Sequence, residues 1–335
     1  MSGLLWPLVP LYAAAVGAKN RSYDRGWARP QRLAWPVVSI GNLSVGGSGK
    51  TPLTLRLVEL LQERGVAVDV LTRGYGRCSM AVERVRPEGS AKEFGDEPLL
   101  LARRSGAPVF VGESRYAAGL LAESQRAGLA SGVHLLDDGL QHRRLARTVD
   151  IVVLHRSDFD GRLVPAGRLR EGFSSLSRAH IVAMREEDRD LEPELRRRGF
   201  QQPVWWMTRR LEPPAARRVA AFCAIARPEE FFAGLAAAGV AVRARRAWRD
   251  HHVFSAADVA ELLELRRQHE AEIFVTTEKD EVRLTPEQRR ILAAAAPLHV
   301  ARLTLRLHDE AAAMDELAAL LARPGKGAAR DAVRK

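Results

Sequence analysis

Residues 44–51 of the 335-residue chain carry the pattern with the clearest chemistry, Ser-Val-Gly-Gly-Ser-Gly-Lys-Thr. Backbone N–H groups of a glycine-rich loop can converge on phosphate oxygens, and a helix that starts there adds partial positive charge. The lysine would neutralise the β- and γ-phosphates of a nucleotide, and the threonine hydroxyl would bind Mg²⁺. The pattern matches a Walker A loop except at Ser44, where a glycine is usual. The predicted nucleotide-binding residues are Gly46, Gly47, Ser48, Gly49, Lys50 and Thr51.

Asp137 and Asp138 follow a strand-like run, residues 133–136, and are the candidates for holding the metal. A phosphate-binding loop needs a carboxylate at the end of a neighbouring strand, which is the Walker B arrangement. Adjacent residues on an extended strand point to opposite faces, so one acid should bind Mg²⁺ and the other should reach substrate or support the site. We predict a Mg²⁺ site made of Thr51, Asp137 and Asp138. The alternative is a solvated pair of acids in a turn.

The elements around the loop predict a βαβ unit. Residues 37–40 form a short β-branched run that ends at a glycine, which is typical of a buried strand. Residues 51–64 carry leucines at helical spacing before Gly65, and residues 67–71 form the next strand. Further strand-like runs lie at residues 108–111, 133–136, 151–154 and 181–184. We therefore expect an α/β fold of the P-loop NTPase type, with a mainly parallel sheet and helices on both faces.

Pro213-Pro214 marks a predicted boundary between two units. Residues 31–215 would form the P-loop unit, and residues 216–325 would form a smaller α/β unit. Residues 326–335 are rich in Gly, Ala and charge, so we expect a disordered tail there.

The first 30 residues are predicted to form a separate N-terminal segment. Residues 3–18 are apolar and are followed by Lys19, Arg21 and Arg25. This apolar run is shorter than the ~20 residues that cross a bilayer, and no positive charge precedes it as it would in a secretory signal. Such a segment can form a helix that lies in the membrane interface. The alternative is a helix docked on the protein's own core.

The formal net charge is +11, and most of the positive residues are arginines. Guanidinium groups suit phosphate-rich partners, although a general preference for Arg and Ala would give the same excess. No helix-turn-helix, zinc finger or aromatic RNA-binding motif is present, so we expect no nucleic-acid partner. The cysteines Cys78 and Cys223 are far apart and lack metal-ligand spacing, which fits a reducing cytosol.

The loop is one of an ordered series of motifs that resembles the tetraacyldisaccharide 4′-kinase family. Residues 41–52 are similar to the family's form of the loop, which also lacks the first glycine. The other motifs follow in the family's order up to about residue 284: 73–77 (RGYGR), 95–98 (GDEP), 111–115 (VGESR), 137–142 (DDGLQH), 165–171 (PAGRLRE), 250–254 (DHHVF) and 276–280 (TTEKD). Leu140 and Arg168 depart from the pattern, which favours an aromatic and a smaller residue at these places.

This resemblance implies a phosphotransferase of lipid A biosynthesis that uses ATP and Mg²⁺. It would transfer the γ-phosphate to the 4′-hydroxyl of a tetraacylated glucosamine disaccharide 1-phosphate at the cytoplasmic face of the bacterial inner membrane. That location favours the interfacial interpretation of the N-terminal segment. One such helix binds only modestly, so the Arg-rich flank would be a second anchor on the anionic membrane surface. We expect a peripheral or monotopic protein that acts as a monomer.

Asp96 is the predicted catalytic base. A sugar hydroxyl is a poor nucleophile at neutral pH, so a carboxylate beside it should accept its proton as the new bond forms. Asp96 stands in a Gly-Asp-Glu-Pro motif at an expected helix start, where it could also serve as an N-cap. The resemblance pairs this base with His251, which would orient or tune it through a hydrogen bond. Such a pair would require the two units to close around the substrate and exclude water.

The acceptor lipid carries a phosphate, which needs cationic partners. The candidate substrate-binding residues within the motifs are Arg73, Tyr75, Arg115, Gln141, His142 and Arg170. Each of them could instead be a solvated side chain or a structural partner. Lys279 follows a strand-like run, residues 273–276, and could lie near the nucleotide.

A different class of function is a nucleotide-switched, membrane-associated P-loop ATPase that acts as a scaffold or partition protein. Proteins of that class carry an extra lysine early in the loop, at the place that Val45 occupies here. A GTPase would need an Asn-Lys-x-Asp segment after a strand, which residues 278–280 do not provide. The residues therefore favour the kinase.

Overall fold

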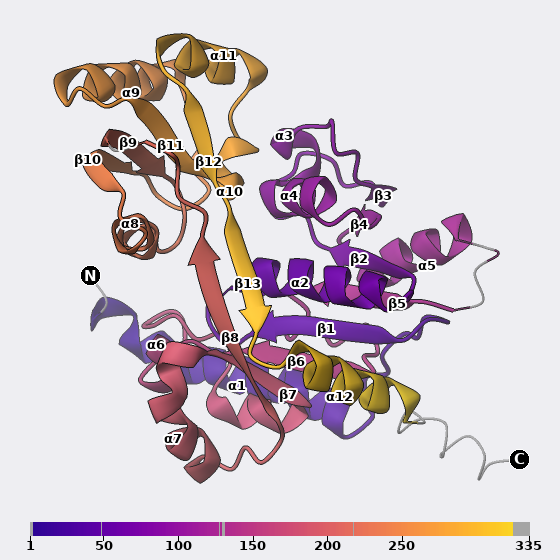
Figure 1. The fold of residues 1–335 in the computed structure, drawn as a ribbon. Coiled ribbons are helices and arrows are strands. Elements are labelled where there is room, and N and C mark those ends of the chain that lie inside the picture. Colours follow the sequence, from indigo (N-terminus) through magenta and orange to yellow (C-terminus); the bar gives the residue numbers. More distant parts are fainter. Residues whose placement is uncertain (1–2, 48, 127, 129–130, 217, 324–335) are drawn as a thin grey trace, which may run out of the picture.

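A nine-stranded sheet forms the centre of the molecule, in the strand order β13-β8-β7-β6-β1-β5-β2-β4-β3 (Figure 1). The structure is a computed structural model that describes residues 3–47, 49–126, 128, 131–216 and 218–323. The strands of this sheet are β1 (Val37–Asn42), β2 (Val68–Thr72), β3 (Glu83–Arg84), β4 (Val109–Val111), β5 (Val133–Asp137), β6 (Val149–Val153), β7 (Ile181–Arg185), β8 (Val204–Leu211) and β13 (Leu303–Leu307).

Strands β1 and β5 lie side by side in parallel and are buried along their whole length. Their register pairs Ile40 with Asp137. The carboxyl ends of parallel strands meet at one edge of a sheet. The glycine-rich loop after β1 and the acidic pair at the end of β5 therefore come to the same edge.

Helices cover both faces of this sheet. Helix α2 (Lys50–Glu63) buries Leu53, Leu57 and Leu60, because leucines at this spacing share one helical stripe. They pack on Val38 and Ile40 of β1, whereas Val37 faces a second cluster on the opposite face. The other helical segments around this sheet are α3 (Ala91–Phe94), α4 (Asp96–Arg104), α5 (Arg115–Gln125), α6 (Arg156–Phe159), η2 (Phe173–Arg178), η3 (Glu186–Leu191), α7 (Glu192–Arg197) and α12 (Glu310–Ala322).

A second, four-stranded parallel sheet has the order β10-β9-β11-β12. Its strands are β9 (Arg218–Cys223), β10 (Ala241–Ala247), β11 (Ile273–Thr277) and β12 (Leu298–Ala301). Its helices are α8 (Pro228–Ala237), α9 (Ala256–Gln268), α10 (Glu278–Glu281) and α11 (Pro286–Ala295). Phe222 of β9 packs with α9 and α11, and Val219 packs with α8, so this sheet also has helices on both faces.

A two-stranded ribbon of β8 and β13 joins the two sheets (Figure 1). The chain leaves the large sheet along β8, forms the smaller sheet, and returns along the antiparallel β13 to α12, which packs on α2. Residues 303–322 thus lie with the larger sheet, although the predicted smaller unit spans 216–325. The division at residue 215 stays a proposal, and the predicted tail, 326–335, lies outside the described residues.

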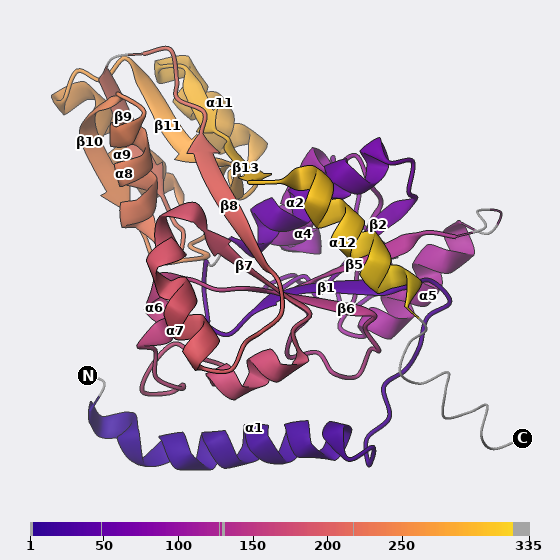
Figure 2. The ribbon, with the colours of Figure 1, turned by 60° about the horizontal axis from the view of Figure 1, so that its bottom comes forward.

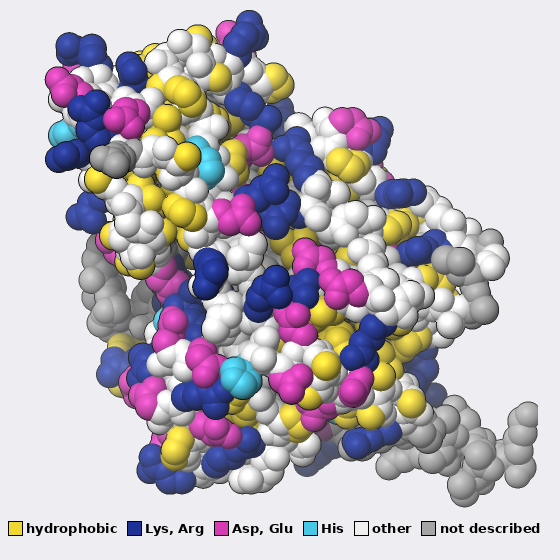
Figure 3. Space-filling view, in the orientation of Figure 1, with side chains coloured by type: hydrophobic (Ala, Val, Ile, Leu, Met, Phe, Trp, Pro, Cys, Tyr) yellow, Lys and Arg dark blue, Asp and Glu magenta, His cyan; other side chains and the backbone are white. Residues whose placement is uncertain are grey.

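The N-terminal segment forms η1 (Gly3–Leu8) and α1 (Val9–Asp24), which lies along one side of the molecule (Figure 2). Trp6, Leu8 and Leu11 expose half or more of their surface. Among the residues that the structure describes, no helix combines the length and the apolar character that crossing a membrane requires. On the face shown in Figure 3, positive and negative side chains are interspersed.

Candidate active site

The phosphate loop lies between β1 and α2, as expected from its glycines. Gly46 and Gly49 have φ angles of 90° and 94°, a region that favours glycine over residues with a side chain. Asn42 is buried at the end of β1 and donates to the backbone oxygen of Ser44 over 2.6 Å. Its Oδ1 accepts a hydrogen bond from Lys50 Nζ at 2.9 Å. Asn42 therefore ties the loop to the lysine; Ser48 lies outside the described residues.

The two acids after β5 have different environments. Asp137 is the last residue of the strand and is buried, and its Oδ1 accepts from Thr54 Oγ1 at 3.2 Å. Asp138 follows with a φ of 52° and pairs with Lys50 over 3.3 Å and with Arg170 over 2.8 Å. The strand ends between them, which turns the two carboxylates toward different partners.

Their pKa values differ for the same reason. Burial, with the charge of Glu97, raises the pKa of Asp137 to about 7. Burial alone would also raise the pKa of Asp138, but Lys50 and Arg170 outweigh it and hold that pKa at about 2. Asp138 is therefore ionised and paired, whereas Asp137 is a buried carboxyl that a cation would stabilise in its charged form.

These residues fit Mg²⁺ bound together with a nucleotide. No cluster of three or more His, Cys, Asp or Glu side chains that could hold a metal occurs within the described residues. Mg²⁺ commonly uses one or two protein oxygens and takes its other ligands from phosphates and water. Asp137 at the end of β5 and Thr51 at the start of α2 supply protein oxygens of that kind.

Asp96 lies at the start of α4 and contacts residues from the smaller sheet's part of the chain. Gly95 is the N-cap and Asp96 the first helical residue, with its Oδ1 accepting from the Glu97 backbone N–H at 2.9 Å. Its Oδ2 lies 2.9 Å from His251 Nδ1 and accepts a hydrogen bond from Arg283 Nε at 2.9 Å. The structure thus brings Asp96 and His251 together and adds Arg283.

The Asp96 carboxylate is 6% exposed. Burial raises its pKa, but the hydrogen bond from His251 and the charges of Lys279 and Arg283 outweigh burial and hold the pKa below its ordinary value. Lys279 Nζ is paired with Glu97 Oε1 at 2.9 Å. The Lys279 ammonium thus lies beside the Asp96–Glu97 pair, and Glu97 in turn acts on Asp137.

Arg170 and Gln141 border the start of the phosphate loop. Arg170 Nη1 donates to both Asp138 oxygens and to Gln141 Oε1, the latter over 3.2 Å. Gln141 Nε2 donates to the backbone oxygen of Asn42 at 3.0 Å. These predicted substrate residues therefore share one hydrogen-bond network with the loop.

The other predicted substrate residues differ in exposure. Arg115 is buried and donates to the Glu113 backbone oxygen at 3.0 Å, while its Nε has no hydrogen-bond partner among the described residues. Burial, followed by the positive charge of Arg115, lowers the pKa of His142 to about 3. Tyr75 is exposed, and its ring centroid lies 5.4 Å from that of His251. The Arg73 side chain is also exposed and lies 3.9 Å from Glu113.

Helix α1 reaches the same network. Tyr12 Oη donates to the Arg170 backbone oxygen at 2.9 Å, and Asn20 Nδ2 donates to Glu171 Oε2 at 2.8 Å. Lys19 Nζ donates to the Gln141 backbone oxygen at 3.0 Å. The N-terminal segment therefore supports the backbone of two predicted substrate residues.

Comparison with known proteins decides the family. The family model described as Tetraacyldisaccharide-1-P 4'-kinase matches residues 1–322. The chain belongs to this family.

The relatives agree with the family match. The tetraacyldisaccharide 4'-kinase of Koribacter versatilis is 43% identical over 329 residues, covering 95% of this chain and 98% of the relative. That of Chromobacterium violaceum is 41% identical, covering 85% of this chain and 84% of the relative. The solved structure of LpxK from Aquifex aeolicus in complex with ATP is 29% identical with a TM-score of 0.75, covering 96% of this chain and 99% of that chain.

These matches confirm the expected family, the P-loop α/β fold and the kinase activity. The chain is a phosphotransferase with an alcohol acceptor, and the comparisons support this function over a nucleotide-switched scaffold. ATP as the nucleotide, with Mg²⁺ as its usual partner, follows from the same family.

Several residues at the site could not be recognised from the sequence. Arg283 is 6% exposed on its side chain and contacts Asp96, Asp280 and the Ala224 backbone oxygen. It lies just past α10, near the end of the last motif. Lys279 was expected near the nucleotide, and the structure pairs it with Glu97. Glu171 stands in a motif, but its contact with Asn20 of α1 carried no sequence signal.

Proposed function

We propose that this kinase transfers the γ-phosphate of ATP to the 4′-hydroxyl of a tetraacylated glucosamine disaccharide 1-phosphate, with Asp96 as the general base. The observation that carries the assignment of the base is the contact of Asp96 Oδ2 with His251 and Arg283. The neighbouring Glu97 acts electrostatically on Asp137, at the end of the strand beside the phosphate loop.

At the nucleotide, the loop amides of Gly46, Gly47 and Gly49 cradle the phosphates, and Lys50 neutralises the β/γ region. Mg²⁺, when bound, neutralises charge that develops on the phosphate oxygens. Asp137 and the Thr51 hydroxyl would hold it. We assign Asp138 a different task, because it is paired with both Lys50 and Arg170. It keeps the lysine and the arginine at the loop.

At the acceptor, Asp96 takes the proton of the 4′-hydroxyl. Its pKa lies below the ordinary value, so it is a weak base toward an unreacted sugar hydroxyl. Phosphoryl transfer has a loose transition state, and the hydroxyl becomes acidic only as its oxygen bonds to phosphorus. The proton therefore moves late, and His251 and Arg283 keep the carboxylate ionised and oriented until then.

The lipid's own phosphate and sugar need polar partners on the same side. Arg170 and Gln141 belong to the network that includes Asp138, and Arg115 offers a buried guanidinium with an unpaired Nε among the described residues. His142 is neutral at physiological pH because its pKa is about 3, so it acts as a hydrogen-bonding group. The exposed Arg73 and Tyr75 complete the proposed lipid site.

The membrane location belongs to the same proposal. The acceptor is a membrane lipid, and Trp6, Leu8 and Leu11 expose apolar surface on the N-terminal helix. We infer a peripheral or monotopic monomer on the anionic cytoplasmic face of the bacterial inner membrane, without a nucleic-acid partner. Sedimentation with phosphatidylglycerol vesicles tests this inference: Trp6→Ser with Leu11→Ser should leave more protein in the supernatant. Equal pelleting of both proteins would contradict it.

The decisive experiment incubates the purified protein with Mg-ATP and the disaccharide 1-phosphate acceptor and follows the acceptor by mass spectrometry. We expect the mass to increase by one phosphate, located at the 4′-hydroxyl by fragmentation. Lys50→Ala should abolish the product because it removes the cation at the β/γ-phosphates. If the wild-type protein forms no product under conditions in which the Koribacter relative does, the proposed function is wrong.

A further inference from the structure

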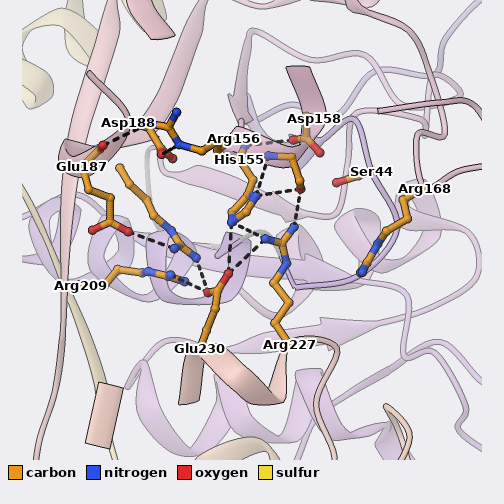
Figure 4. A network of polar contacts seen from close by, with 12 residues as sticks. Ser44, His155, Arg156, Asp158, Arg168, Glu187, Asp188, Arg209, Arg227 and Glu230 are labelled. Carbon is orange, nitrogen blue, oxygen red and sulfur yellow. Dashed lines mark hydrogen bonds and ion pairs between the residues drawn. The ribbon is translucent and has the colours of Figure 1, made fainter. Parts of the chain in front are cut away.

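A group of charged side chains outside the motifs gathers around Glu230 on α8 (Figure 4). We call it the Glu230 cluster; its members are His155, Arg185, Arg209, Arg227 and Glu230. Arg209 Nη2 donates to Glu230 Oε2 at 2.9 Å, and Arg227 Nη1 donates to Oε1 at 3.1 Å. Arg185 is a third cationic partner, and His155 Nε2 lies 3.1 Å from Oε1.

The cluster joins the two parts of the molecule. Arg209 lies on β8, in the strand that leaves the large sheet, and Arg185 lies on β7. Arg227 and Glu230 belong to α8 and its N-cap beside the smaller sheet. One carboxylate therefore holds arginines from both parts.

The same cluster borders the phosphate loop. A Cβ placed on Gly49 would lie 3.8 Å from Arg209 Nη1. Elsewhere in the loop, a Cβ placed on Gly47 would lie 3.7 Å from the Cβ of Ala226, the residue before Arg227. The Arg209 guanidinium thus spans the space between Gly49 and Glu230, with Nη2 on the carboxylate and Nη1 toward the loop.

The charges around this space do not balance. Arg185, Arg209 and Arg227 share Glu230, and among the described residues only Arg185 has a second carboxylate, Glu187, at 3.1 Å. The side chains of Arg209 and Arg227 are only 18% and 14% exposed, so water screens their charge incompletely. A surplus of partly buried positive charge beside a phosphate loop suits an anionic ligand.

We propose that Arg209 binds the α- and β-phosphates of the nucleotide, and that Glu230 is the positioning residue that holds it at Gly49. This inference rests on the proposed function, because it assumes that ATP occupies the loop. The assignment to the α/β-phosphates follows from Gly49: loop glycines cradle these phosphates, whereas the loop lysine reaches the β/γ region. Arg209 would then approach the polyphosphate from outside the loop.

The first test measures equilibrium binding of Mg-ATP and Mg-ADP by calorimetry. Arg209→Gln should weaken both nucleotides about 10-fold or more, since a charge-assisted hydrogen bond is lost. The KM for the lipid acceptor should stay unchanged. Arg209→Lys should recover part of the affinity, because a lysine keeps the charge but cannot serve Glu230 and phosphate together. Arg210→Gln is the matched control, since Arg210 is the next residue on β8 and is exposed.

Three results would overturn the proposal. Unchanged affinity for both nucleotides would mean that Arg209 does not reach them. Weaker binding of ATP alone would place the arginine at the γ-phosphate. An equal rise in the acceptor KM, with a lower melting temperature in both Arg209→Gln and Arg209→Lys, would indicate a purely structural role.

The second test asks whether Glu230 acts through Arg209. Glu230→Gln should raise the Kd for Mg-ADP less than Arg209→Gln does, with little change in kcat. In the Arg209→Gln background the Glu230 substitution should add nothing, because a residue that only positions another has no separate effect. Additive effects would contradict the positioning role. Glu229→Gln is the control, since Glu229 is a neighbouring acid that is 79% exposed on its side chain.

These measurements separate the inference from the proposed function. Nucleotide binding is measured without acceptor, so it does not depend on which alcohol is phosphorylated. If Arg209→Gln weakens both nucleotides but wild-type protein phosphorylates no lipid, the inference stands and the proposed function fails. If wild-type protein phosphorylates the lipid and Arg209→Gln binds nucleotides normally, the reverse holds.

Discussion

The carboxylate of Asp96, the proposed catalytic base, combines two features: it is buried, and its pKa is lowered rather than raised. Many bases are tuned toward neutral pH by burial. Here Arg283, Lys279 and His251 oppose that effect. The base is therefore always ionised at physiological pH, and its efficiency depends on position more than on basicity.

Asp96→Asn should stop turnover and leave ATP binding intact. The amide has nearly the same shape but cannot accept the proton, so kcat should fall about 10²- to 10⁴-fold. The Kd for Mg-ATP, measured by calorimetry, should change less than about threefold, because Asp96 lies outside the loop. Lys50→Ala is the comparison, since it should damage both quantities. Near-normal turnover of Asp96→Asn would show that the base is another group.

Mg²⁺ binding should strengthen with pH because of Asp137. Its pKa is raised to about 7 by burial and by Glu97, so the metal must displace a proton over much of the neutral range. The stability of the metal-free protein should change in the opposite direction. Because the pKa of this carboxyl is higher in the folded than in the unfolded state, the free energy of unfolding falls as pH rises from about 4 through 7.

Thermal unfolding with and without Mg-ATP at pH 6, 7 and 8 measures both effects. The shift caused by Mg-ATP should be smallest at pH 6, and the melting temperature without metal should fall toward pH 8. Asp137→Asn, which has no proton to lose, should remove the pH dependence in both series. A metal effect that is equal at all three pH values would rule out Asp137 as a ligand.

At the scale of single residues, those that could be predicted stand in a recognisable motif with their neighbours along the chain. Lys50 and Asp137 stand in short motifs whose spacing reflects the chemistry. Arg283 and Arg209 could not be predicted, because the chain has 52 lysines and arginines and only tertiary packing selects the ones that meet a carboxylate.

At the scale of elements, the βαβ unit around the loop was predictable to within a residue or two. Expected strand 37–40 and helix 51–64 correspond to β1 and α2, since a continuous β-branched run and a leucine stripe are strong local signals. Strand β8 was missed although Trp205 and Met207 alternate with more exposed residues, which is a period of two. Its partner β13 lies about a hundred residues later in the chain, as the register of Leu307 with Met207 shows.

Helix α1 contacts the backbone of Arg170 and Gln141, two of the proposed lipid-binding residues. Tyr12→Phe should raise the KM for the lipid acceptor a few-fold, because the Arg170 backbone oxygen loses its donor over 2.9 Å and one net hydrogen bond contributes about 1 kcal/mol. The KM for ATP should not change. Steady-state kinetics with each substrate varied in turn measures both values.

Tyr23→Phe is the matched control on the same helix, because its ring faces Arg143 at 5.1 Å and a phenylalanine keeps that contact. If Tyr12→Phe raises the KM for ATP as much as that for the lipid, α1 stabilises the loop as a whole and not the lipid side. No change in either KM would leave α1 without a role in positioning Arg170.

At the scale of the whole molecule, the proposed active site includes two contacts between parts that fold around different sheets. One joins Asp96 of α4 to His251 and Arg283, and the other joins Arg209 of β8 to Glu230 of α8. The two sheets were predictable from their strand patterns, but their relative placement was not. It is set by the β8–β13 ribbon, which brings the chain back to the first sheet (Figure 1).

We propose that Arg283 is the residue through which this arrangement acts on catalysis. It holds the Ala224 backbone oxygen and Asp280 in its own part of the molecule, and Asp96 in the other. Arg283→Gln removes one of the charges that lower the pKa of Asp96 and leaves the burial that raises it. The pKa of Asp96 should therefore rise, and the acidic limb of the pH profile of kcat/KM for the lipid should move to higher pH.

Arg283→Lys separates the effect of charge from that of geometry. The lysine keeps the positive charge but lacks the guanidinium group that bridges Asp96 and Asp280. If the positive charge of residue 283 controls the pKa of Asp96, Arg283→Lys should return the acidic limb most of the way to its wild-type pH. The kcat of this variant should stay reduced, because the lysine positions Asp96 less well. Arg290→Gln, an exposed arginine on α11, should leave the profile unchanged. An acidic limb that stays in place in Arg283→Gln would mean that the group titrating in the profile is not Asp96, because the loss of a cation beside that buried carboxyl must raise its pKa.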